Sequence, residues 1–281
     1  MSLVEYKILF PSDYFNVREV DAEYKTEYDE AGNQGYQTVL FAYDEYIINN
    51  KLLLYPTNFE PGVYIYRGWM LKSADYKRLY SELKQRGIQL INNPEEYRSC
   101  HEFPYSYEMI KDLTPKILIY KENEKINWDY VKSTFHKFMI KDFVKSVKGT
   151  NFPICFDQSY SNSVLDDFIN QFKEMRGELF SEGIVIKEFV DLKRYDGKTK
   201  EYRLFYLDGK IINIFPQDIY EDKLIPTGFI SLIPSLNSNF YTVDIAEKED
   251  DSWIIIEAGD GQVSGLPEYK DAKEFYKQIK C

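Results

Sequence analysis

The spacing of apolar positions predicts strands that alternate with helices over the first hundred residues. A helix is expected from Ser73, where apolar residues recur at helical spacing, to Gly87, which follows its last turn. Another should begin at residues 93–96, because asparagine caps a helix, proline fits its first turn and acids favour its dipole. The runs that predict strands are residues 6–10, 39–48, 63–71 and 88–92. This alternation favours an α/β layer over residues 1–110.

Beyond residue 110 the pattern changes to apolar strands joined by tight turns. Asp208-Gly209 lies between two such runs and predicts a type I′ hairpin turn. Ser163 and Asp166 predict a capping box, and the helix that follows has one apolar face. The predicted strands are residues 114–120, 138–146, 183–190, 241–246 and 252–258, and the predicted closing helix is residues 267–280.

Charge and composition narrow the classes of function. The formal net charge of −11 disfavours non-specific binding to nucleic acid, although it leaves room for a local basic groove. Three scattered cysteines fit a reducing compartment, so we expect a cytoplasmic protein. His101 and His136 are the two histidines, and without a spaced ligand pair a zinc site is not expected. No apolar run is long enough for a bilayer, so no membrane partner is expected.

Two acids lie inside apolar strands near the end of the chain. Asp244 is part of YTVDIA, and Glu257 is part of SWIIIEA, which runs into a Gly-Asp-Gly-Gln loop. A carboxylate in an apolar strand is costly to desolvate unless it is paired or binds a cation. Alternation allows both acids to meet over one sheet face, where Mg²⁺ accepts such oxygen ligands together with substrate phosphates. The alternative is two strand-end acids that face water or pair with lysines.

Two cations, Lys141 and Arg203, also lie inside predicted apolar strands. Lys141 is central in an apolar strand, and a lysine there needs an anion or an outward-facing position. Lys145 and Gly149 follow it in a loop that is suited to approach phosphates. Arg203 lies in KEYRLFYLDG, and a fixed guanidinium suits recognition of phosphate or carboxylate. The alternatives are an edge-strand lysine and a surface pair of Arg203 with Glu201.

Taken in chain order, these segments resemble the ATP-grasp family. The matching pieces are FMIKDFVKS, IVIKEFV, KEYRLFYLDG, YTVDIA and IIIEAGDGQVSGLP, which together span residues 138–267. The GDGQVSGLP ending and the YRGWML segment at 66–71 are similar to the divergent clade of that family named for two arginines and one lysine.

The resemblance implies an α+β fold: an α/β N-terminal pre-ATP-grasp domain, then an ATP-grasp fold with antiparallel sheets and flanking helices. The implied domains are residues 1–110 and 111–281. Within the second, a lid subdomain is expected at about 115–187 and a C-terminal metal and phosphate subdomain at about 188–281.

The resemblance also implies roles for individual residues. Those implied to bind ATP are Lys141, Lys145, Lys187, Glu188, Val190 and Arg203, of which Lys141 and Arg203 are implied to be catalytic. The family's usual Glu-x-Asn pair is absent, so the implied Mg²⁺ ligands are Asp244, Glu257 and either Asp260 or Gln262. The second arginine of the clade is left open among Arg176, Arg98 and Arg67. Candidate substrate contacts are Arg67, Trp69, Arg98 and Arg176.

The implied activity is that of an ATP-dependent, Mg²⁺-dependent ligase. It would join the carboxylate of an amino acid, peptide or protein end to an amine or similar nucleophile through an acyl phosphate, with a small-molecule or peptide acceptor. One alternative is a nucleic-acid (RNA) ligase or modifying enzyme, against which the net charge weighs. Another is a non-catalytic interaction module, for which the poor glycine loop argues. The sequence leaves the acceptor and the oligomeric state open.

Overall fold

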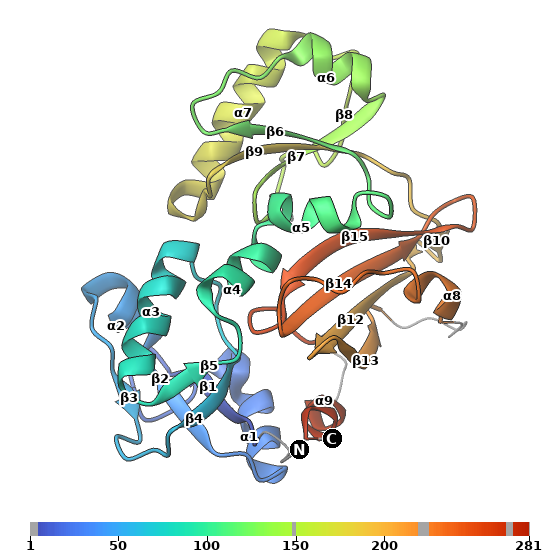
Figure 1. The fold of residues 1–281 in the computed structure, drawn as a ribbon. Helices are drawn as coiled ribbons and strands as arrows, with labels where there is room; N and C mark the ends of the chain where they lie inside the picture. Colours follow the sequence, from blue (N-terminus) through green and yellow to red (C-terminus); the bar gives the residue numbers. More distant parts are fainter. Residues whose placement is uncertain (1–4, 148–149, 219–224, 268–271, 281) are drawn as a thin grey trace.

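A computed structural model describes residues 5–147, 150–218, 225–267 and 272–280. Its three main sheets are stacked along the long axis of the molecule (Figure 1). The N-terminal sheet lies at one end, an antiparallel sheet in the middle, and at the other end a second antiparallel sheet with two helices, named the lid sheet here after the predicted subdomain. The predicted α+β class is confirmed. Within these ranges, no helix is both long enough and apolar enough to cross a membrane.

The N-terminal sheet has the order β3-β2-β1-β4-β5, with β3 antiparallel to its neighbour and the other strands parallel. Its strands are β1 (Lys7–Pro11), β2 (Thr38–Phe41), β3 (Leu54–Tyr55), β4 (Gly62–Tyr66) and β5 (Ile88–Leu90). Its helices are η1 (Ala22–Tyr24), α1 (Lys25–Asn33), α2 (Tyr43–Asn49), α3 (Ser73–Gln85) and α4 (Pro94–His101).

Two of the predicted strands in this sheet are too long. The run 39–48 leaves the sheet after Phe41 and continues as α2, because Asp44 and Glu45 in its first turn favour a helix N-terminus. The run 63–71 is a strand only as far as Tyr66. The predicted start of α4 is confirmed by a capping box at Asn93.

The lid sheet is antiparallel with the order β6-β9-β7-β8. Its elements are β6 (Ile117–Lys121), α6 (Trp128–Thr134), β7 (Lys137–Asp142), β8 (Phe156–Asp157), α7 (Asn162–Arg176), η2 (Gly177–Leu179) and β9 (Gly183–Glu188). Helix α7 buries Leu165, Ile169 and Phe172, as its apolar face predicted. The capping box predicted at Ser163 is wrong: Ser161 precedes the helix, and its hydroxyl accepts from the Val164 amide.

The middle sheet is antiparallel with the order β13-β12-β14-β15. Asp208 and Gly209 both have positive φ, 49° and 73°, which confirms the predicted tight hairpin turn. Helix α5 contacts β15. The elements of this part are α5 (Phe103–Ile110), β10 (Arg194–Tyr195), β11 (Lys198–Thr199), β12 (Glu201–Leu207), β13 (Lys210–Pro216), α8 (Thr227–Ile230), β14 (Phe240–Glu247) and β15 (Trp253–Asp260).

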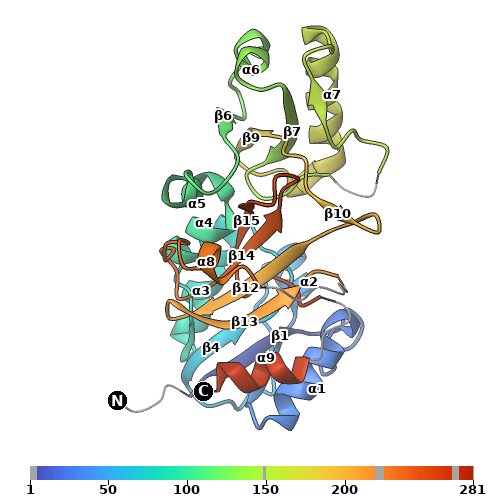
Figure 2. The same cartoon turned by 90° about the vertical axis from the view of Figure 1, so that its right-hand side faces the viewer.

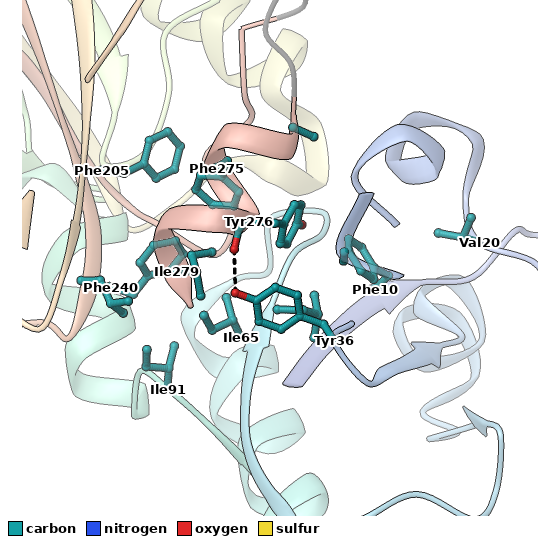
Figure 3. Packing of buried hydrophobic residues seen from close by; sticks show 14 of the residues in the cluster. Phe10, Val20, Tyr36, Ile65, Ile91, Phe205, Phe240, Phe275, Tyr276 and Ile279 are labelled. Carbon is teal, nitrogen blue, oxygen red and sulfur yellow. Dashed lines mark hydrogen bonds between the residues drawn. The ribbon is translucent and has the colours of Figure 1, made fainter. Parts of the chain in front are cut away.

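The closing helix α9 (Ala272–Ile279) packs on both the N-terminal sheet and the middle sheet, and residues 268–271 lie outside the described part. Figure 2 shows it running beside α1. Phe275 packs on Phe205 of β12, while the Tyr36 hydroxyl donates to the Tyr276 carbonyl at 2.7 Å (Figure 3). The two ends of the chain therefore share one core. The division at residue 110 stays a prediction.

Candidate functional site

A row of three charged side chains crosses the middle sheet. Arg203 on β12 lies directly opposite Asp244 on β14, and Asp244 lies directly opposite Glu257 on β15. Opposite residues of antiparallel strands point to the same face, so the three side chains stand side by side. The Arg203 guanidinium donates to both Asp244 oxygens, at 2.8 and 2.7 Å. The register confirms that the two acids share a face.

Two lysines of the lid sheet reach β15 from the opposite side of the site. Lys141 lies on β7, and Lys187 on β9 is paired with Met139, two residues before Lys141, so both lysines project from one face of the lid. The Lys141 ammonium lies 3.3 Å from a Glu257 oxygen. The Lys187 ammonium donates to the Ile256 carbonyl at 2.6 Å. The lysines therefore connect the lid to the charged row.

Burial makes this pair of lysines electrostatically unusual. Each is only 4% exposed, and their ammonium groups lie 4.9 and 4.3 Å from the centre of the Phe103 ring on α5. Burial, and then the charge of Lys141, lower the pKa of Lys187 to about 7. Each ammonium has three N–H donors, so Lys141 beside Glu257 and Lys187 beside the Ile256 carbonyl can also donate to an incoming anion.

A cavity of about 290 Å³ lies where the lid meets the middle sheet. Residues of both sheets and of the chain after β9 line it, among them Met139, Lys187, Glu188, Phe189, Val190 and Ile256. The end of β9 is fixed, because the amides of Glu188 and Phe189 donate to the carbonyls of Lys116 and Lys137. Apolar walls beside a fixed backbone segment suit a flat heterocycle with a hydrogen-bonding edge.

A smaller, polar cavity of about 30 Å³ adjoins the charged row. Glu257 lines both this cavity and the larger one, so the two are neighbours. The other polar and charged residues that line it include Lys145, Arg203, Asp244, His101, Thr242 and Ser264. A ligand that reaches from the larger cavity to the smaller one would place a flat ring against the apolar walls and polar groups beside the charged row.

The acids of the row fit magnesium when phosphate oxygens complete the shell. In the ranges that the structure describes, no group of three acidic, histidine or cysteine side chains gathers around one point. Asp244 and Glu257 instead offer two carboxylates, each paired with a cation, Arg203 or Lys141. Mg²⁺ typically binds through one or two carboxylates together with substrate phosphates and water. The donor set therefore suits magnesium that arrives with a triphosphate.

Asp260 and Gln262 make their side-chain hydrogen bonds toward the N-terminal sheet. The Asp260 carboxylate accepts from Asn92 at 2.6 Å and from the Gln262 amide group at 3.2 Å, while burial raises its pKa to about 7. The Gln262 side chain accepts from the Tyr66 amide and donates to the Tyr76 hydroxyl. Asp260 lines the polar cavity, but both side chains are engaged in fastening β15 to the N-terminal part. A role for either as metal ligand stays a prediction.

Arg67, a predicted substrate contact, is 1% exposed. It lies between α1 and the loop that follows β15. Its guanidinium donates to both oxygens of Glu27, at 2.9 Å each. It also donates to the carbonyls of Gly261 and Ser264, at 2.6 and 2.8 Å. These contacts hold the loop that follows the charged row.

The other predicted substrate contacts each have an acidic partner that is not part of the charged row. Trp69 donates from its ring to Asp21, Arg98 to Glu102 and Arg176 to Asp142, at 2.9, 3.2 and 2.7 Å. Arg98 also lines a separate surface cavity with Ser73 and Glu182. Whether any of them meets substrate stays a prediction, as does the identity of the second clade arginine.

Three residues at the site were not singled out from the sequence. Phe103 and His101 reach it from α5 and α4, which lie far from the strands in sequence. Ser264 fills the space beside Gly259, where an added Cβ would lie 3.1 Å from the hydroxyls of Ser264 and Thr242. Thr242 lies on the same strand face as Asp244, so the alternation along this strand could have indicated that it lies near the site. Nothing in the sequence pattern pointed to the other three. Gly149, predicted in the phosphate loop, lies outside the described residues.

The fold and the site define an ATP-grasp protein. The model that matches residues 126–279, more than half of the chain, describes an ATP-grasp domain: family 3 of the clade named for two arginines and one lysine. The chain therefore belongs to this family, and the predicted membership is confirmed. A search of curated proteins found no match.

Solved structures with ATP-grasp folds align over almost the whole chain. A RimK domain ATP-grasp protein from Sphaerobacter thermophilus is 14% identical, with a TM-score of 0.61 and coverage of 98% of both chains. The D-alanine–D-alanine ligase of Bacillus anthracis, complexed with ATP, is 14% identical, with a TM-score of 0.58 and coverage of 98% of this chain and 96% of that one. The ATP-grasp ligase PsnB with its minimal precursor is 9% identical, with a TM-score of 0.56 and coverage of 98% and 99%. At these identities the likeness establishes the ATP-grasp ligase fold.

Proposed function

We propose that this protein is an ATP-dependent, Mg²⁺-dependent ligase that joins a carboxylate to an amine or similar nucleophile through an acyl phosphate. The observation that carries the proposal is the continuous set of charges Arg203–Asp244 and Glu257–Lys141 between two cavities of matching character. Adenine would occupy the larger cavity, against Glu188 and Val190.

The charged side chains of the site neutralise one another in pairs. ATP and magnesium together would take over these pairings. Lys141 pairs with Glu257, and Arg203 pairs with Asp244. A triphosphate would take over the contacts of the cations, with Lys145 and Lys187 beside it, and would leave the two acids for the metal. Either ligand alone would leave one set of charges without partners, which is costly in a partly buried site.

The chemistry would then rest on positioning and charge neutralisation. A carboxylate oxygen of the donor substrate forms a bond to the γ-phosphorus while the bond to the ADP oxygen breaks. An amine then attacks the acyl phosphate carbon, inorganic phosphate leaves, and the nitrogen loses a proton. Arg203 would stabilise charge on the phosphoryl oxygens, while Lys141 and Lys187 would hold the phosphates. Magnesium held by Asp244 and Glu257 would neutralise phosphate charge.

A small molecule or peptide is the acceptor that we propose. Structures of similar fold include PsnB with its minimal precursor and the D-cycloserine synthetase DcsG. We propose that residues 1–110 help to select the acceptor and that residues of about 115–187 act as the lid. Magnesium dependence and a cytoplasmic location belong to the same proposal.

The test is a thermal-shift series with ATP, Mg²⁺ and the two together, followed by product analysis with candidate acids and amines. We expect a larger shift for the pair than for either ligand, and release of ADP when the correct substrates are present. AMP release would redirect the proposal to adenylylation, as in an RNA ligase. No shift with any combination would indicate an interaction module.

A further inference from the structure

His101, at the last turn of α4, reaches the polar cavity from the N-terminal side. It is 8% exposed and lines that cavity with Arg203, Asp244 and Glu257. The other residues that line the cavity from the N-terminal part include Met70, which is apolar. His101 therefore brings a polar ring into the space where the charged row ends.

The imidazole has unused hydrogen-bonding capacity. Neither ring nitrogen has a hydrogen-bond or ion-pair partner among the described residues. The described side-chain atoms that are sealed from solvent without a partner are Ser12 Oγ, Tyr206 Oη and Asn213 Oδ1. The ring nitrogens of His101 are not among them, so the small exposed part of the residue includes its polar atoms. A buried ring that keeps its donor for a cavity is unusual, because buried polar groups are normally paired.

The ring is also held rigidly. It stacks on Tyr97 with centroids 4.7 Å apart, and Tyr97 stacks on Tyr76 at 3.8 Å. The Tyr97 hydroxyl bonds to both the amide and the carbonyl of Leu71. The capping box at Asn93 fixes the start of the same helix. A group held in this way needs little reorganisation to contact a reacting atom.

We propose that His101 is a further catalytic residue, which donates a hydrogen bond from its ring to an oxygen of the phosphoryl group as it moves from ATP to the acceptor carboxylate. The inference rests on the proposed function of the same site. It assigns the N-terminal part of the chain a direct contact with the reacting group, in the cavity that Arg203 also lines.

Burial and the charge of Lys145 lower the pKa of His101 to about 3, so the imidazole is neutral. A neutral imidazole still has one N–H, and it can polarise an anionic oxygen without carrying charge itself. Such a donor acts most strongly where charge is redistributed in the transition state.

The experiment compares a ground-state mimic with a transition-state mimic, so no acceptor is required. AMP-PNP with Mg²⁺ represents bound ATP, and ADP with Mg²⁺ and aluminium fluoride represents the phosphoryl group in transfer. His101→Phe preserves the stack on Tyr97 but removes the donor, whereas His101→Gln retains an N–H. His136→Gln, the other histidine, is the matched control.

We expect His101→Phe to bind AMP-PNP as the wild type does, while its affinity for the aluminium fluoride complex falls by about 100-fold. His101→Gln should recover part of that loss, and His136→Gln should change neither affinity. Equal binding of the aluminium fluoride complex by wild type and His101→Phe overturns the inference and leaves the proposed function intact. Failure of the wild type to bind AMP-PNP overturns the proposed function itself.

A spectroscopic measurement covers the case in which the phenylalanine variant does not fold. With ¹⁵N-labelled histidine the wild type has two imidazoles, and His136→Gln assigns the signals. Addition of the aluminium fluoride complex should shift the ring nitrogens of His101. An unchanged His101 signal in the saturated wild-type complex contradicts the proposed contact.

Discussion

Lys141 lies 3.3 Å from Glu257, so a lysine of the lid sheet is paired with an acid of the middle sheet across the candidate nucleotide site. The lysine side chain is 5% exposed and the acid 27% exposed, so the pair lies at the inner edge of a solvent-connected cavity. A pair in this position can exchange partners when a ligand enters.

Replacing Lys141 by methionine should weaken ATP binding by roughly 10- to 100-fold, the usual value of a hydrogen bond to a charged group. The lost ammonium would no longer meet the phosphates. Isothermal titration with AMP-PNP and Mg²⁺ measures the effect. Lys137→Met, on the same strand but exposed and paired with Asp191, is the control and should bind normally. An unaltered titration for Lys141→Met would return this residue to a structural role.

Replacing Arg203 by lysine should lower the rate of ATP turnover by about 100-fold, with a smaller effect on ATP affinity. Lysine keeps the charge but not the paired donors that the guanidinium presents to Asp244. Steady-state ADP release, once substrates are found, measures the change. Arg86→Lys, at an exposed position on the N-terminal part, should leave turnover intact. Equal rates of ATP turnover in Arg203→Lys and Arg86→Lys would contradict a catalytic role for Arg203.

Arg67 forms a buried ion pair with Glu27, which should contribute to stability. Its replacement by methionine leaves Glu27 buried without a cation, which should lower the free energy of unfolding by about 3 to 5 kcal/mol. Urea denaturation measures the loss. Lys25→Met is the comparison, because both side chains of its ion pair with Asp29 are more than half exposed and such a pair should contribute less than about 1 kcal/mol. Equal, small losses in both variants would leave room for a substrate role for Arg67.

Lys187 should make stability depend on pH. Its pKa is about 7 in the folded protein and 10.5 ordinarily, so the unfolded chain binds more protons between these values. Burial of Lys187 therefore lowers the free energy of unfolding most below about pH 7. As the pH rises above about 7 this loss becomes smaller, by at most about 1.4 kcal/mol per pH unit. Urea unfolding of wild type and Lys187→Met at about pH 6, 8 and 9.5 should show this rise only in the wild type. Parallel profiles would contradict the lowered pKa.

Much of the fold followed from local patterns. The strands that carry Lys141, Arg203, Asp244 and Glu257 were predicted because each is a mainly apolar run with strand-like composition. The hairpin at Asp208-Gly209 followed from turn chemistry. Their order along the chain then indicated the ATP-grasp family, which the family model confirms.

Other features depended on contacts that a local pattern does not contain. The run 39–48 is apolar except for Asp44 and Glu45, and its composition alone does not show that the strand ends at Phe41 and that α2 follows. His101 and Phe103 lie near the site because α4 and α5 pack against β15. Asp260 follows Glu257 closely in sequence, yet its carboxylate bonds to Asn92, some 168 residues earlier in the chain.

The most direct test of the central claim is calorimetric titration of Mg²⁺ with and without saturating AMP-PNP. For the wild type we expect the nucleotide to raise Mg²⁺ affinity at least about 10-fold, and Mg²⁺ to raise nucleotide affinity by the same factor, since coupling is reciprocal. Asp244→Asn and Glu257→Gln should abolish the coupling while the folded state persists, and Asp250→Asn, in the exposed turn between β14 and β15, should preserve it. Full coupling in Asp244→Asn and Glu257→Gln would contradict the account.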